Sequence, residues 1–432
     1  MKNKLVKGTI ILLIGGFITK IFSMVIRIIL TKTVGTSGLG LYMLILPTFN
    51  LFITLSSLGL QTAISKLVSE HIKNNKKIIL SIIPVVILLN LALIIILYLI
   101  APTLSTVLLQ NKETYYPLIA IGLTLPFICI SGIIRGYFFG KEKMIPPTVA
   151  TIIEQIVRLT LTVTIIPALM KNSITIAITG VVIINVASEL ASILTSFFYL
   201  PKNINISLSD IKHDKQYVKD VFSIGLPTTT SRLVGSLGYF LEPIIITFIF
   251  NKLGYTSNYI TEEYAIVSGY VLPVLLLPSF FTLAISNVIL PVVSSSYAKK
   301  QYSYTKIKIK QACFISLLVG VPLSIIFFLF PSQILNLMYS TNVGAQYLRI
   351  SSIFFLIYYL QSPLTSVLQA IDKSKSAMNG TIYGTIIKTL LIILLPTLKL
   401  GMWSLLIATI ASILVTTIHH YIVVKKCLQK HF

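Results

Sequence analysis

The segment ILPTFNLFITLSSLGLQTAISKLVSE, residues 45–70, has a counterpart late in the chain, LLPSFFTLAISNVILPVVSSSYAKK, residues 276–300. The two segments share residue types at one constant offset: Pro47 with Pro278, Phe49 with Phe280, and Ser65 with Ser296. Two shorter pairs repeat in the same order: FITKIF (17–22) with TTSRLV (229–234), and residues 144–167 with residues 378–396. Self-similarity on this scale predicts a duplicated architecture, with halves at residues 1–210 and 211–432.

The composition places both halves in a membrane. Hydrophobic residues make up 55% of the 432-residue chain, charged residues only 11%, and the mean hydropathy is +0.90. A soluble domain carries roughly 25% charged residues. The apolar runs are about 20 or more residues long, as helices that cross a ~30 Å hydrocarbon core require, and the alternating pattern of an outer-membrane barrel is absent. We therefore expect an all-α integral membrane protein.

Twelve membrane spans are predicted, six in each half. Their approximate bounds are 8–31, 39–64, 78–101, 116–139, 148–170, 174–199, 219–250, 264–290, 311–331, 346–371, 378–398 and 401–424. The intervening loops contain helix breakers, among them VGTSGLG at 34–40, MIPP at 144–147 and PKN at 201–203. Because each half has an even number of spans, both halves have the same orientation in the membrane. The repeat is therefore parallel, with its axis along the membrane normal. Transporters with such repeats bind substrate where the halves face each other, although a duplication without a transport role remains an alternative.

The net charge of +23 follows the predicted topology. The loops on the side of the N-terminus hold 22 lysine and arginine residues, and the opposite loops hold 5. By the positive-inside rule, both termini of this multi-pass chain are predicted to be cytoplasmic. An anionic lipid surface therefore explains the charge better than a nucleic acid does. The lysines at 299–310 could bind a cytoplasmic partner, but a solvated loop is the favoured interpretation.

Cofactor and enzyme signatures are absent from the sequence. Cys129, Cys313 and Cys427 are scattered, and His419 and His420 are adjacent without an HExxH motif, so we expect neither a disulfide nor a metal site. No Walker A motif or catalytic constellation is visible, so the chain is not expected to be an enzyme, and any transport is passive or ion-coupled. The N-terminal apolar run continues to about residue 31 with no A-x-A-like cleavage site, which predicts a retained first helix rather than a signal peptide.

Eight basic residues remain outside these loops, in the predicted spans or at their ends. Three of them, Lys66, Arg135 and Arg349, lie near span ends and are interpreted mainly as anchors that snorkel to the interface. Each charge near mid-span costs about 2.5–3.5 kcal/mol at the bilayer centre, and so is expected to face a cavity, a partner or a substrate. The mid-span cations are Lys20, Arg158, Arg232 and Lys388. The repeat pairs Lys20 with Arg232, and Arg158 with Lys388.

Acidic residues are fewer at this depth, where only Glu154, Glu189 and Glu242 occur. With Arg27 included, the deep cations outnumber these carboxylates, so the sequence predicts a cavity that attracts an anion such as a phosphate. Lys20 and Arg27 are seven residues apart and fall on one helix face, and no acidic residue lies in their span.

Ion pairing gives some of these charges a structural interpretation. Glu154 and Arg158 have the i,i+4 spacing of an intrahelical ion pair, and a purely structural pair is the favoured interpretation for them. Arg232 and Glu242 are ten residues apart and cannot pair directly on one helix. Each could instead meet a partner on another helix.

Several strings resemble those of the stage V sporulation protein B family, within the multidrug/oligosaccharidyl-lipid/polysaccharide (MOP) exporter superfamily. They include residues 7–49, IIRGYFFGKEKMIPP (133–147), EQIVRLTLT (154–162) and LPTTTSRLVGSLGYFLEPIII (226–246). The resemblance covers about residues 5–424. It implies two six-helix lobes in a V-shaped, MATE-like fold and a role in moving a lipid-linked peptidoglycan precursor for spore cortex synthesis.

The related mouse virulence factor family of lipid II flippases holds the substrate diphosphate with basic residues in the first helix. Lys20 and Arg27 stand at the nearest positions here, with the second displaced by one residue, and Arg232 lies in the helix that lines the central cavity of that fold. This chain departs from the flippases by lacking a basic residue in its second span. It also has twelve predicted spans where many relatives have fourteen, which leaves room for a different lipid-linked glycan.

The leading hypothesis is a flippase of the cell membrane that moves a lipid-linked glycan by alternating access. The predicted substrate-binding residues are Lys20, Arg27, Arg158, Arg232 and Lys388. Carboxylates that balance charge or hold a coupling ion are Glu154, Glu189 and Glu242. No cofactor is expected, and the expected partners are the glycan diphosphate and membrane lipids. Two alternatives remain: a cation-coupled multidrug exporter of the same fold, and a non-transporting scaffold for cell-wall enzymes.

Overall fold

The computed structural model describes residues 2–70, 75–200 and 215–429, and these residues form helices and short connections with no β-strand. The helices up to residue 197 are α1 (Lys2–Ser57), α2 (Leu60–Glu70), α3 (Asn75–Thr103), η1 (Leu104–Leu108), η2 (Lys112–Thr114), α4 (Tyr115–Gly140), α5 (Ile145–Met170) and α6 (Ile174–Phe197). Those from residue 215 are α7 (Lys215–Lys252), α8 (Ser257–Tyr264), η4 (Ala265–Val271), α9 (Leu272–Leu275), α10 (Ser279–Ala298), α11 (Tyr302–Leu329), α12 (Pro331–Tyr339), α13 (Ala345–Ala370), α14 (Ser374–Leu394), η5 (Leu395–Leu398) and α15 (Trp403–Gln429).

Helix α1 contains the first two predicted spans, joined at a sharp kink. The predicted loop at 34–40 is wrong, because helical structure resumes directly after Gly35. Gly35 has φ 66° and ψ −172°, a backbone conformation that is essentially restricted to glycine. Eleven helical segments of the described residues are long and apolar enough to cross a membrane, and the 61-residue segment Ile10–Glu70 holds two crossings. The observed number is thus consistent with twelve spans.

Replacing Gly35 with alanine is expected to destabilise the protein by about 1–3 kcal/mol, because a Cβ atom strains this backbone conformation. The cost comes from the backbone alone, since a Cβ at Gly35 meets no atom within 4 Å. The measurement is thermal unfolding of the purified chain in detergent. Gly132→Ala is the matched control: its Cβ also meets open space, but Gly132 lies inside α4, where alanine favours the helix. Equal melting temperatures for the two variants would contradict the expectation.

The repeat is visible in the order and length of the helices. Helices α4, α5 and α6 of the first half have 26, 26 and 24 residues, and their counterparts α13, α14 and α15 have 26, 21 and 27. By proximity the chain divides into two compact units, Met1–Pro243 and Ile244–Phe432, so the division falls within α7. The boundary predicted between residues 210 and 211 lies outside the described residues.

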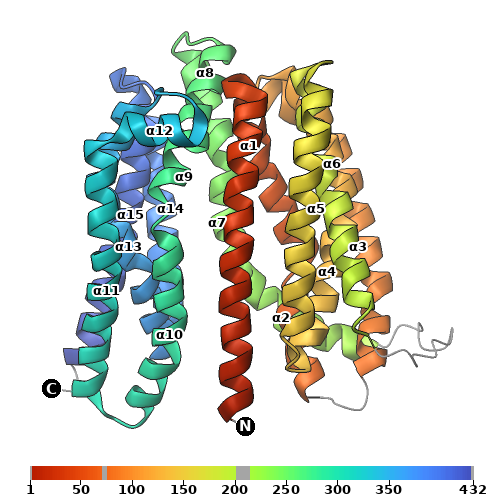
Figure 1. Ribbon diagram of the computed structural model, residues 1–432, viewed down its shortest axis with the longest axis vertical. Helices are drawn as coiled ribbons and strands as arrows, with labels where there is room; N and C mark the ends of the chain where they lie inside the picture. Colours follow the sequence, from red (N-terminus) through yellow and green to blue (C-terminus); the bar gives the residue numbers. More distant parts are fainter. Residues whose placement is uncertain (1, 71–74, 201–214, 430–432) are drawn as a thin grey trace. The chain divides into compact units, whose positions relative to one another are not determined.

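In the first unit, α1 packs against α5, α5 against α6, and α4 against α2, α3 and α6 (Figure 1). The approach of α2 to α4 is close because α4 presents Gly136 and Gly140, four residues apart. A Cβ at these positions would lie 2.7 Å from the carbonyl oxygen of Gln61 and 2.6 Å from that of Ser65. Small residues at this spacing let helix backbones approach in a membrane. This contact fixes α4, and with it Arg135, beside the first spans.

The second unit has its own core, in which α10, α11, α14 and α15 contribute to a cluster around α13. Large apolar side chains are also exposed on both units, for example Leu88 of the first and Phe314 of the second, which are 70% and 66% exposed. In water such surfaces would aggregate, whereas they suit contact with lipid tails. The candidate site described next lies among helices of the first unit.

Candidate anion-binding site

A cavity of about 190 Å³ lies in the first unit among α1, α5 and α6. Both arms of α1 contribute, because the kink at Gly35 folds residues 39–46 back beside residues 23–30. We call this cavity the Arg27 pocket. Its polar lining consists of Ser23, Arg27, Tyr42, Gln155, Arg158, Thr162 and Asn185. The described residues that line it include two arginines and no carboxylate.

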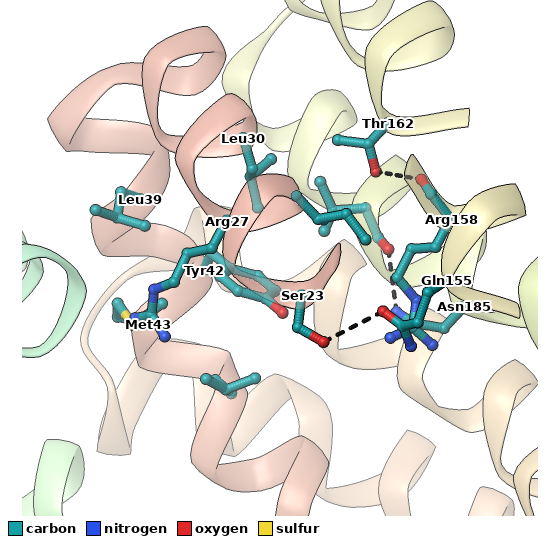
Figure 2. Close-up of a pocket in the computed structure, with 13 residues that line it drawn as sticks. Ser23, Arg27, Leu30, Leu39, Tyr42, Met43, Gln155, Arg158, Thr162 and Asn185 are labelled. Atoms are coloured by element: carbon teal, nitrogen blue, oxygen red, sulfur yellow. Dashed lines mark hydrogen bonds between the residues drawn. The ribbon is translucent and has the colours of Figure 1, made fainter. Parts of the chain in front are cut away.

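The two arginines approach the Arg27 pocket from different helices. Figure 2 shows Arg27 of α1 beside Met43, and Arg158 of α5 beside Gln155 and Asn185, with Ser23 between them in this view. The Arg27 Nη2 atom lies 3.6 Å from the Met43 sulfur, a weak acceptor that an anionic oxygen would readily replace. The Ser23 hydroxyl donates to Gln155 Oε1 at 3.3 Å and joins α1 to α5.

Beside the pocket, four charged side chains form a partly buried cluster at the junction of α4, α5 and α6. Glu154 accepts hydrogen bonds from Arg158 Nη2 at 2.9 Å and from Arg135 Nη2 at 2.6 Å. Glu189 lies 3.5 Å from the same Arg135 nitrogen. We call Arg135, Glu154, Arg158 and Glu189 the four-charge cluster. Its formal charges cancel, and Arg27 is the other charged side chain among the described residues that line the pocket.

The cluster tests two interpretations made from the sequence. The intrahelical pair of Glu154 and Arg158 is confirmed. The interpretation of Arg135 as a snorkelling anchor is wrong: its side chain is 23% exposed and binds Glu154, which is only 6% exposed. Arg135 was interpreted as an anchor because it lies near the end of its span. In the structure, α4 packs against α5 and α6, and the guanidinium group points toward their carboxylates.

Other predicted residues lie elsewhere. Lys20 is exposed on α1 and does not line the Arg27 pocket. Arg232 is exposed on α7, and Lys388 is half-buried on α14 of the second unit. Glu242 is buried, at 4% exposure, and its charge and that of Arg27 act in opposite directions on the hydroxyl of Tyr239. The geometry therefore brings together Arg27, Arg158, Glu154 and Glu189, while the roles of Lys20, Arg232, Lys388 and Glu242 remain predictions.

Sequence reasoning missed the uncharged polar residues of the pocket. Ser23 lies one turn from Arg27, and Gln155 lies one turn from Arg158 and beside Glu154. The helical spacing from the charged residues could therefore have pointed to both. Asn185 had no comparable sequence signal. In the structure its side-chain amide donates to the backbone carbonyls of Val181 and Val182 in its own helix.

Comparison with known proteins identifies the family. A model of the family described as polysaccharide biosynthesis protein matches residues 5–297, and a model of the MatE family matches residues 240–394. The chain belongs to the polysaccharide biosynthesis protein family. Over 99% of its length it is 34% identical to stage V sporulation protein B of Bacillus subtilis (strain 168), of which 85% is covered.

Solved structures share the fold of this polysaccharide biosynthesis protein. An inward-facing multidrug resistance MATE family transporter of the MOP superfamily superimposes with a TM-score of 0.73 at 15% identity, covering 96% of this chain and 95% of that one. The lipid II flippase MurJ in an inward closed conformation gives 0.71 at 20% identity, covering 95% and 87%. The predicted all-helical MATE-like fold of the MOP superfamily is confirmed. The chain is thus a multi-pass membrane protein of this family.

Proposed function

We propose that this protein is a flippase that moves a lipid-linked glycan across the cytoplasmic membrane by alternating access, with both termini in the cytoplasm. The observation that carries the proposal is the Arg27 pocket, lined by two arginines and, among the described residues, by no carboxylate. A low-dielectric cavity with this charge favours an anion and disfavours a cationic drug. A lipid-linked peptidoglycan precursor, with its diphosphate, is the proposed substrate.

The size of the pocket limits which part of the substrate it holds. At about 190 Å³ it is smaller than the roughly 300–1,000 Å³ of pockets that enclose a drug-sized ligand. It therefore suits the phosphate groups, while the glycan and the lipid tail lie outside it. Arg27 and Arg158 bind the phosphate oxygens, since guanidinium groups match them in planar, forked geometry. In this proposal Lys20, Arg232 and Lys388 contact the substrate at other stages of transport.

The carboxylates have a separate role in the proposed mechanism. Glu154 holds Arg158 in place when no substrate is bound, because the two groups lie 2.9 Å apart. A phosphate that takes hydrogen bonds from Arg158 weakens this ion pair. Glu154 and Glu189, together with Glu242, are then the candidates for balancing charge or for holding a coupling ion.

The test is transbilayer movement in liposomes that contain the purified chain. Movement of a fluorescent lipid-linked peptidoglycan precursor between leaflets is expected to require the protein. The same lipid as a free alcohol without phosphates is expected to move at the same rate with and without the protein, because the arginines have nothing to bind. Movement is read from the fraction of fluorescence that an impermeant quencher reaches. Transport of a fluorescent cationic drug instead of the precursor would favour the multidrug exporter. Movement of neither, under proton and sodium gradients, would favour a scaffold.

A further inference from the structure

A second cavity of about 190 Å³ lies in the first unit among α1, α2, α4 and α5. Arg135 lines it, together with Gln61 and the threonines Thr19, Thr148 and Thr151. We call it the Arg135 pocket, and we propose that it is a second diphosphate-binding subsite, occupied before or after the Arg27 pocket as the substrate crosses. This inference rests on the proposed function, because it takes the same phosphate groups as the ligand.

The two pockets lie in series along one face of each of two helices. On α1, the Arg135 pocket uses Leu12, Gly16 and Thr19, and the Arg27 pocket uses residues 23, 26, 27 and 30, which continue the spacing of three or four residues. On α5, Thr148 and Thr151 are continued by residues 155, 158 and 162. At 1.5 Å per residue, the pockets are centred about 15 Å apart along both helices. The α1–α5 interface therefore carries two pockets at successive depths.

Arg135 can serve an anion in the second pocket. Its Nη2 atom binds Glu154 and lies near Glu189, but its Nε–H is buried and, within the described residues, has no acceptor. A buried donor without an acceptor requires an explanation, and a bound anionic oxygen supplies one. The three threonine hydroxyls donate to backbone carbonyls of their own helices. Arg135 and Gln61 are thus the side chains of this pocket that can donate to a phosphate.

Two contacts at the Arg27 pocket would exchange partners as phosphates pass. The Ser23 hydroxyl donates to Gln155 where both residues line the Arg27 pocket, on the side toward Thr19 and Thr151 in sequence. Glu154 holds the arginine of each pocket, Arg135 at 2.6 Å and Arg158 at 2.9 Å. A phosphate that binds either guanidinium competes with this one carboxylate. Because Glu154 binds both arginines, a phosphate bound in one pocket changes how strongly Glu154 holds the arginine of the other pocket.

The test measures how strongly a diphosphate protects a cysteine in each pocket from methyl methanethiosulfonate. In full-length protein whose native cysteines are replaced by alanine, Thr151→Cys reports on the Arg135 pocket and Leu46→Cys on the Arg27 pocket. At a concentration of about four times Kd, a bound diphosphate slows modification about five-fold. Inorganic pyrophosphate and farnesyl diphosphate are compared, so that a free diphosphate is distinguished from a lipid-linked one. We expect protection of Thr151→Cys by farnesyl diphosphate, retained in Arg27→Ala and lost in Arg135→Gln.

A second variant avoids disturbing the ion pairs of Arg135. A Cβ at Gly16 meets no atom within 4 Å, so Gly16→Leu fills the Arg135 pocket without an initial clash. It is expected to abolish protection of Thr151→Cys, whereas Gly132→Leu, which also enters open space but lines neither pocket, is expected to preserve it.

The outcomes separate this inference from the proposed function. Protection of Leu46→Cys alone overturns the second subsite and leaves the flippase proposal intact. Protection of Thr151→Cys without Leu46→Cys supports the second subsite and contradicts the assignment of the Arg27 pocket. Protection of Thr151→Cys by pyrophosphate but not by farnesyl diphosphate identifies a free anion as the ligand and overturns the subsite for a lipid-linked substrate. Protection that survives Gly16→Leu also overturns it.

Discussion

Arg27→Ala is expected to weaken binding of farnesyl diphosphate roughly 10- to 150-fold, because a hydrogen bond to a charged group contributes about 1.5–3 kcal/mol. Arg27 lines the pocket together with Arg158, and the described lining residues include no carboxylate. Arg27→Lys keeps the charge but loses the planar fork of donors, so its affinity is expected to fall between those of the wild type and Arg27→Ala. Isothermal titration of the purified protein in nanodiscs measures the three dissociation constants.

The matched control for Arg27 is Arg349→Ala. Arg349 is an exposed arginine on α13 of the second unit, so its loss removes the same charge from the chain without altering the pocket. Its affinity is expected to stay within about two-fold of the wild type, since distant surface charges are screened by salt. Equal weakening by both variants would mean that net charge rather than the Arg27 pocket attracts the ligand.

Glu154→Gln is expected to lower the free energy of unfolding by about 3–5 kcal/mol, because it leaves two partly buried guanidinium groups without their shared anion. Arg135 and Arg158 are 23% and 25% exposed at the side chain, so water replaces little of the lost interaction. The amide has nearly the same shape as the carboxylate, and the effect therefore reports charge rather than packing. Unfolding in mixed micelles with increasing denaturing detergent gives the free energy.

Two further variants identify the cause. Glu70→Gln removes an exposed carboxylate that lies 3.9 Å from Lys66 in α2, and it is expected to change stability by less than about 1 kcal/mol. The double variant Glu154→Gln with Arg135→Gln is expected to be less destabilised than the sum of its single changes, because one orphaned cation is removed with its partner. Additive losses would show that the four-charge cluster is not energetically coupled.

The architecture of the protein could be predicted from local and periodic features. Apolar runs of membrane-spanning length gave the helices, and the match of residues 45–70 to residues 276–300 gave two similar halves. The bond between Glu154 and Arg158 was also predictable, because helix geometry alone brings residues four apart together. The kink at Gly35 was the local exception: seven breaker-rich residues suggested a loop, while one glycine sufficed to turn the chain.

The sequence by itself therefore determined the membrane class, the duplicated helices and the surplus of deep cations, because these depend on composition and on neighbours along the chain. Only the tertiary structure decided which charges meet. Arg135 binds Glu154 across 19 residues of sequence, and Ser23 binds Gln155 across 132. Such pairs depend on which helix faces pack together, and a close approach such as that of α2 to α4 at Gly136 is a property of two helices jointly. Arg135, which was expected to be an anchor, therefore contacts the buried carboxylates Glu154 and Glu189 because of how the helices pack.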